Sequence, residues 1–92
     1  MSQTIAKDVR VTGFVQGVFF RAWTQEKARA LGVNGWVRNC SDGSVEARFE
    51  GPSDKVRWLI DLMRDGPSGS RVDHVHAREA AVEGLDGFDV RR

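Results

Sequence analysis

The sequence has little cysteine, almost no net charge and no long apolar run. Its single cysteine, Cys40, has no second cysteine in the chain to pair with, which argues against the disulfide-stabilised class of small secreted domains. The formal net charge is +1, so strong nonspecific binding to nucleic acid is not expected. No stretch near the N-terminus is apolar enough for a signal peptide or a membrane span. These absences predict a cytoplasmic protein that binds neither membranes nor nucleic acid.

The composition is that of a small globular domain. The chain has 92 residues, of which 40% are hydrophobic and 29% charged. A chain of this length buries only about two-thirds of its surface and has room for one core. Low-complexity tracts and solenoid-length repeats are absent from the sequence. We therefore predict a single domain over residues 1–92.

Residue periodicity and turn signals predict the order of the elements. Alternating apolar residues indicate strands, helical spacing indicates two helices, and Asp42-Gly43 is a strong hairpin signal. The predicted elements are a strand over Ile5–Val11, a helix over Arg21–Leu31, strands over Val33–Cys40 and Ser44–Glu50, a helix with Ser53 as N-cap and an apolar stripe of Val56, Leu59, Ile60 and Met63, and strands over Arg71–Ala80 and Phe88–Arg91.

This order predicts an α+β fold of the ferredoxin-like, split βαβ type: βαββαβ plus a short C-terminal edge strand, with an antiparallel-rich mixed sheet and both helices on one face. The other sheet face is then exposed to water. Its predicted outward residues are Asp8, Arg10, Thr12, Glu46, Arg48 and Glu50. Because they carry mixed charge and no aromatic ring, they argue against an RNA-binding domain of this fold, which stacks bases on such a face.

The most informative segment lies between Gly13 and Arg21 and reads Gly-Phe-Val-Gln-Gly-Val-Phe-Phe-Arg. It leaves a predicted strand and brings Arg21 to the start of a predicted helix, where the helix dipole disfavours a cation. A bound anion would offset this, held by loop N–H groups and the guanidinium. Gly17 can adopt a positive φ and let the backbone approach a small ligand. An ordinary strand-to-helix turn, with Arg21 solvated or paired with a carboxylate, explains the spacing equally well.

Two segments together resemble the acylphosphatase family. The first is Gly13 to Arg21, and the second is Gly35-Trp36-Val37-Arg38-Asn39-Cys40-Ser41-Asp42-Gly43-Ser44-Val45. Smaller matches, at Gly51-Pro52 among other places, extend the resemblance over almost the whole chain. It implies hydrolysis of the carboxyl-phosphate anhydride of a small-molecule acyl phosphate to a carboxylate and inorganic phosphate. It also implies no metal, no cofactor and no covalent enzyme intermediate, and we expect a monomer.

The resemblance also implies roles for particular residues. Arg21 would bind the phosphate and Asn39 would hold the attacking water. An arginine stays protonated and offers a planar fork of donors, whereas an asparagine orients a water without acting as a strong base. A phosphate oxygen would then take the proton. The phosphate would also be bound by the main-chain amides of Val15, Gln16, Gly17, Val18 and Phe19.

Simpler interpretations remain for several of these residues. Asn39 is a common residue type beside a turn such as Asp42-Gly43. We expect the Gln16 side chain to hydrogen-bond the loop to itself instead of touching substrate. Family members commonly end with an arginine followed by an aromatic residue, whereas this chain ends Arg91-Arg92, so support of Arg21 by the C-terminal segment is in doubt.

Other chemistry-bearing residues give weaker signals. His74 and His76 share a strand face but lack a third metal ligand, and Cys40 has no nearby histidine to activate it. We interpret the three tryptophans (Trp23, Trp36 and Trp58) as core or partly buried packing residues. Two alternatives to an enzyme remain: a noncatalytic sensor of phosphate or an acyl phosphate such as carbamoyl phosphate, and the acylphosphatase-like segment of a larger carbamoyl-phosphate-using maturation protein. The short length of the chain argues against the second.

Overall fold

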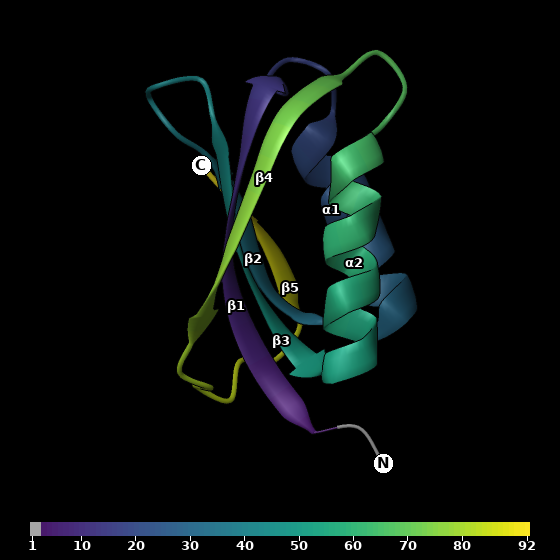
Figure 1. The fold of residues 1–92 in the computed structure, drawn as a ribbon, viewed down its shortest axis with the longest axis vertical. Coiled ribbons are helices and arrows are strands. Elements are labelled where there is room, and N and C mark those ends of the chain that lie inside the picture. The colour runs from purple at the N-terminus through teal and green to yellow at the C-terminus, as the bar shows by residue number, and fades with distance from the viewer. Residues whose placement is uncertain (1–2) are drawn as a thin grey trace.

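A computed structural model describes residues 3–92, in which two helices cover one face of a five-stranded sheet (Figure 1). The elements are β1 (Thr4–Phe14), α1 (Phe20–Leu31), β2 (Asn34–Asn39), β3 (Val45–Pro52), α2 (Ser53–Asp65), β4 (Arg71–Ala80) and β5 (Phe88–Arg91). The predicted βαββαβ order with an additional terminal strand is confirmed, and so is the ferredoxin-like fold class.

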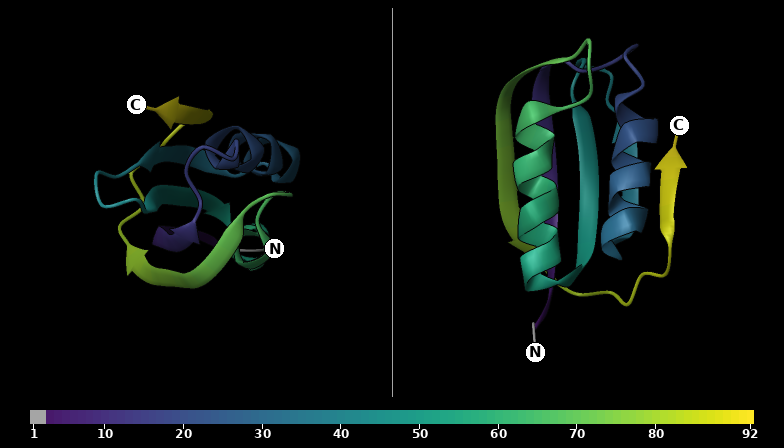
Figure 2. Two further views of the ribbon diagram at one scale, coloured as in Figure 1. Left: turned by 90° about the horizontal axis from the view of Figure 1, so that it is seen from above. Right: turned by 90° about the vertical axis from the view of Figure 1, so that its right-hand side faces the viewer.

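The sheet has the strand order β4-β1-β3-β2-β5. All neighbouring strands are antiparallel except β2 and β5, which are parallel. The C-terminal strand therefore lies at one edge of the sheet, beside α1, while β4 and α2 lie toward the other edge (Figure 2). This arrangement brings the end of the chain to the side of the molecule where α1 begins.

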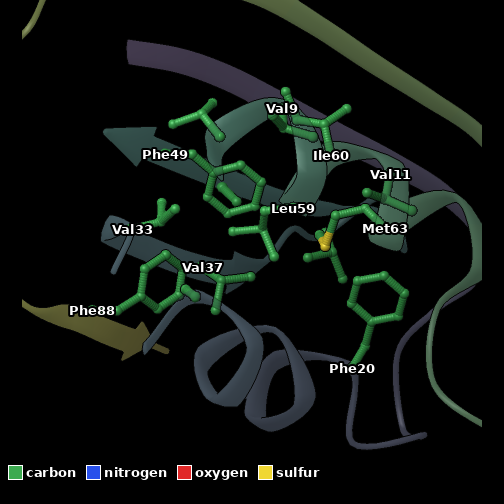
Figure 3. Packing of buried hydrophobic residues seen from close by; sticks show 14 of the residues in the cluster. Val9, Val11, Phe20, Val33, Val37, Phe49, Leu59, Ile60, Met63 and Phe88 are labelled. Atoms are coloured by element: carbon green, nitrogen blue, oxygen red, sulfur yellow. The ribbon is translucent and has the colours of Figure 1, made fainter. Parts of the chain in front are cut away.

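The core lies between the sheet and the helices (Figure 3). The predicted stripe of α2 is buried as expected, with Val56, Leu59, Ile60 and Met63 facing the sheet. Alternate residues of the strands pack in the same buried cluster, among them Val9, Val11, Val37, Phe49 and Phe88. Phe20, the first residue of α1, closes one end of this core and packs edge-on against Trp23.

Several predicted boundaries were wrong. β2 spans Asn34–Asn39 where Val33–Cys40 was predicted, and β3 spans Val45–Pro52 where Ser44–Glu50 was predicted. β1 extends beyond Val11 to Phe14, because it continues to pair with β4 past an irregularity between Thr12 and Gly13. α1 begins at Phe20, one residue before the predicted start. Ser53 is already helical, so Pro52 is the N-cap of α2 and no side chain caps this end. The Ser53 N–H instead donates to the Gln3 carbonyl at 2.9 Å.

Glu50 is buried, although strand alternation predicted that it faces water. It lies on the outer sheet face, but the β4–β5 connection crosses it, and only 3% of the residue is exposed. Its carboxylate accepts hydrogen bonds from the N–H groups of Glu83, Gly84 and Leu85 at 2.8, 3.1 and 3.0 Å. Burial alone would raise the pKa of Glu50, but these N–H groups and the nearby Arg48 outweigh it and hold the pKa below 4.5.

The outer face also carries an aromatic ring that the predicted set of outward residues omitted. Trp36 pairs across the strands with Arg48 and so shares its face. The guanidinium carbons of Arg91 and Arg38 lie 4.6 and 5.6 Å from the centre of its ring. Trp36 is half-buried, and these two cations lie near its ring. The ring therefore makes cation–π contacts within the protein.

Candidate active site

The loop between β1 and α1 turns sharply at two residues with left-handed backbone angles. Gly17 has φ of 76°, and Phe19, immediately before the helix, has φ of 61°. The position where a Cβ of Gly17 would stand has no heavy atom within 4 Å. The glycine is therefore required by the backbone conformation and leaves open space beside the loop. Val15, in contrast, is buried in the core and anchors the start of the loop.

This loop forms one wall of a cavity of about 310 Å³. The cavity brings together Arg21 from α1 and Asn39 from β2, two residues separated by most of a helix and a strand. Its lining residues are Val15, Gly17, Phe19, Phe20, Arg21, Ala22, Asn39 and Val90. Two of the predicted loop residues do not line it: Val18 packs against the core and Gln16 points to the β2–β3 connection.

A slightly larger cavity, about 340 Å³, lies on the outer sheet face over β1, β3 and β4. Three of its charged lining residues are already in ion pairs, since Arg10 binds Glu46 and Asp8 binds Arg48. It contains no loop with free amides and no helix start. We therefore place the candidate active site in the smaller of these two cavities, because it combines a cation with the first turn of a helix and the larger one does not.

Arg21 is held in the cavity by the C-terminal strand. Its Nη1 donates to the Arg91 carbonyl at 3.0 Å. The partner is thus a backbone group, neither the carboxylate nor the solvent that an ordinary turn would have supplied. Because the partner is a carbonyl, the atypical Arg91-Arg92 ending does not remove the support of Arg21 that the sequence put in doubt.

The electrostatic setting of Arg21 favours an anion. It is the second residue of α1, and the first turn of this helix contains no acidic side chain. The exposed N–H groups of the helix start and the guanidinium both contribute positive potential there. Only one guanidinium contact, to Arg91, is made within the described residues. The remaining donors are available to a ligand.

Asn39 is the last residue of β2 and is half-buried. Strand alternation places it on the same sheet face as Val37, the face that α1 covers. Within residues 3–92, no protein group hydrogen-bonds its side-chain amide. Its carbonyl oxygen and its NH₂ group are therefore both available in the cavity.

Gln16 connects the loop to the strand pair that carries Asn39. Its Nε2 donates to the carbonyls of Cys40 and Ser44 at 2.8 and 2.9 Å. The side chain is structural, as expected, but it binds the β2–β3 connection instead of its own loop. Asp42 stabilises that connection, because its Oδ1 accepts hydrogen bonds from the Ser44 hydroxyl and N–H at 2.6 and 2.9 Å. These bonds lower the pKa of Asp42.

The weaker candidates stay outside this site. The rings of His74 and His76 stack 5.8 Å apart on β4, and residues 3–92 contain no group of three or more histidine, cysteine or acidic side chains placed to hold a metal. Trp58 is 54% exposed and not packed in the core, contrary to expectation, and Lys55 lies over its ring. No helix in the described part of the chain is long and apolar enough to cross a membrane.

Comparison with known proteins decides the family. The acylphosphatase family model matches residues 7–90. The chain belongs to the acylphosphatase family. It is 46% identical to an acylphosphatase of Natronomonas pharaonis over 92 residues, which is the full length of both chains. As an acylphosphatase, it is a hydrolase that acts on acid anhydrides, and acyl phosphates are its substrate class.

Solved acylphosphatase structures agree with this assignment. An acylphosphatase from Coxiella burnetii is 39% identical and superposes with a TM-score of 0.93, covering 96% of this chain and 93% of the other. An acylphosphatase from Bacillus subtilis is 31% identical with a TM-score of 0.93, covering 98% and 100%. The likeness therefore includes every element that borders the candidate active site, from β1 to β5.

Proposed function

We propose that this acylphosphatase hydrolyses acyl phosphates by direct attack of a water molecule that Asn39 holds. Arg21 and the main-chain amides of residues 15–19 bind the phosphate: those of Val15, Gly17 and Phe19 belong to residues that line the cavity, and those of residues 16 and 18 lie between them in the loop. The observation that carries this proposal is the single cavity lined by the loop, by Arg21 and by Asn39. These parts come from separate elements, and no structural requirement of the fold explains why an unpaired amide and a cation should meet there.

The phosphate is bound by positive charge and by hydrogen-bond donors that point toward it. Loop N–H groups and the start of α1 point donors at an anion, and the guanidinium adds a charge-assisted pair of hydrogen bonds. Arg91 holds one guanidinium nitrogen through its carbonyl, so the fork is oriented before substrate arrives. Positive charge fixed in this way stabilises the charge on the transferring phosphoryl group without reorganisation.

The water is oriented, not deprotonated, by the protein. The Asn39 carbonyl oxygen accepts a hydrogen bond from the water and directs its lone pair at phosphorus. As the new P–O bond forms, the bond from phosphorus to the acyl oxygen breaks and the carboxylate leaves. A nonbridging phosphate oxygen takes the proton of the water. Positioning and charge stabilisation are sufficient here because an acyl phosphate already has a good leaving group.

The same residues supply what a metal ion would otherwise supply. The guanidinium and the amides neutralise the phosphoryl oxygens, so we propose that catalysis needs neither metal nor cofactor. We propose a monomeric enzyme of the cytoplasm that acts on small molecules and not on membranes or nucleic acid. The net charge of +1 supports the last point, because it provides no broad positive surface for a nucleic acid.

The test is hydrolysis of benzoyl phosphate in excess chelator by the wild type and by Arg21→Ala and Asn39→Ala. We expect each variant to lose about 10²-fold or more in kcat/KM, the effect of removing one oriented hydrogen-bonding group from a preorganised site. Arg29→Ala is the matched control: Arg29 is also on α1 and also donates to a β5 carbonyl, that of Phe88, but it lies outside the cavity. We expect it to keep its activity.

Four outcomes would contradict the proposal. Turnover at the wild-type rate by Arg21→Ala or by Asn39→Ala removes that residue from the mechanism. Loss of turnover in chelator, restored by a divalent ion, contradicts metal-independent catalysis. Binding of inorganic phosphate without any turnover identifies the protein as a sensor. Hydrolysis in ¹⁸O-labelled water checks the site of attack, because attack at phosphorus puts the label in phosphate and attack at the carbonyl puts it in the carboxylate.

A further inference from the structure

Phe19 is a phenylalanine where neither packing nor backbone conformation calls for one. Its side chain is 85% exposed, so the ring is excluded from the core that Phe20, its neighbour, helps to fill. Phe19 is also the single residue other than glycine with a positive φ in residues 3–92. Bulky side chains disfavour this region, and strained residues of this kind concentrate at functional sites.

The position of Phe19 connects it to the site. It lines the cavity that contains Arg21 and Asn39. Val90 of β5 lines the same cavity and is 37% exposed, so a second apolar group borders the site from the C-terminal strand. An acyl phosphate bound as proposed places its phosphate against the loop amides. Its acyl group must then extend out of the phosphate cradle, where these two apolar side chains border the cavity.

We propose that Phe19 is a specificity-determining residue whose ring packs against the acyl group of the substrate. It selects aromatic and larger apolar acyl phosphates over acetyl phosphate, and Val90 contributes a second apolar group at the same cavity. This inference rests on the proposed function. The exposed ring gains contact area only when an acyl group covers it, which explains a phenylalanine at a strained and solvated position.

The test separates the ring from the backbone. In Phe19→Asn and Phe19→Gly the new residue adopts the left-handed conformation more readily than phenylalanine, so the loop keeps its shape while the ring is lost. The measurement is kcat/KM for benzoyl phosphate and for acetyl phosphate in each variant. Any change in the phosphate cradle affects both substrates and cancels in the ratio of the two values.

We expect the benzoyl-to-acetyl ratio to fall about three- to tenfold in both variants, the fold-change that one aromatic contact provides. Phe19→Tyr, which keeps a ring, should restore it. Trp58→Gln is the matched control, because Trp58 is another exposed aromatic residue but lies on α2 outside the cavity. Its ratio should equal that of the wild type. Calorimetric titration with benzoylphosphonate and acetylphosphonate, which cannot be hydrolysed, should show the same change in relative affinity.

An unchanged ratio in Phe19→Asn and Phe19→Gly overturns this inference while the wild type still hydrolyses both substrates. Equal losses for both substrates leave the ratio unchanged as well, and they assign Phe19 to the shape of the loop alone. Failure of the proposed function looks different, since it appears as undiminished activity of the Arg21 or Asn39 variants, or as a wild type that hydrolyses neither substrate, and not as a change in this ratio. A ratio that falls as much in Trp58→Gln as in the Phe19 variants also overturns the inference.

Discussion

Replacement of Glu50 by glutamine should destabilise the protein by about 2 kcal/mol, although neither residue would touch a substrate. Oε1 of Glu50 accepts hydrogen bonds from the N–H groups of Gly84 and Leu85, and Oε2 accepts one from Glu83. Glutamine keeps one acceptor oxygen but places an NH₂ group where the other oxygen stood. Glutamine therefore loses a charge-assisted hydrogen bond, and its NH₂ group faces a backbone N–H group, so that two donors oppose each other. Together these effects cost about 2 kcal/mol. Alanine removes all three bonds, with an expected loss of about 3–4 kcal/mol.

The assay is urea unfolding, in which the midpoint shifts while the slope stays constant. In a domain of this size, 1 kcal/mol corresponds to roughly 4–8 °C in Tm, so Glu50→Gln should melt about 10 °C lower. The matched control is Glu46→Gln. Glu46 lies on the same strand and the same face, but its bonds go to the more exposed Arg10 and Arg38. That change should cost about 1 kcal/mol or less.

The pH dependence gives an independent check. The pKa of Glu50 in the folded protein lies below the ordinary value of 4.5. Between the two pKa values the unfolded chain binds more protons than the folded protein does. The stabilisation is therefore complete above about pH 4.5 and is lost as the pH falls through the folded pKa. The difference in stability between wild type and Glu50→Gln should narrow on acidification. A loss under about 0.5 kcal/mol at pH 7, within the usual range for surface substitutions, or a difference that widens in acid, would refute this reasoning.

Two further predictions concern the loop and the sheet. Gln16→Met keeps the volume of the side chain but removes its hydrogen bonds to Cys40 and Ser44, so the distance between the loop and Asn39 should no longer be fixed. We therefore expect kcat/KM for benzoyl phosphate to fall about tenfold or more. Unchanged kinetics would show that these bonds serve stability alone. Gly35→Ala would drive a Cβ into the Arg48 carbonyl oxygen, so we expect a loss above about 3 kcal/mol in urea unfolding or no folded protein. Gly69→Ala, also at positive φ but with open space around it, should lose only about 1–2 kcal/mol, and equal losses at the two positions would contradict the steric explanation.

The fold was predictable from sequence because its signals are local. The stripe of α2 repeats at helical spacing, and Val45, Ala47 and Phe49 alternate along β3, so burial follows from periodicity alone. The Asp42-Gly43 turn fixes the hairpin that carries Asn39. The pairing of Arg21 with Asn39 in one site was expected only through the family resemblance. Nothing in the local pattern of either residue indicates that they share a cavity.

The features that only the tertiary structure decided are contacts between segments far apart in the chain. Alternation alone predicted that Glu50 is exposed to water. It is buried because the β4–β5 connection, more than thirty residues later in the chain, crosses its strand. Arg21 finds its partner in the Arg91 carbonyl, seventy residues away, because β5 pairs in parallel with β2 beside α1. The sequence by itself determined which faces of the strands and helices are apolar, since that depends on spacing along the chain. The contacts that cover such a face come from later segments of the chain. They depend on the path of those segments, and so only the assembled sheet and helices determine them.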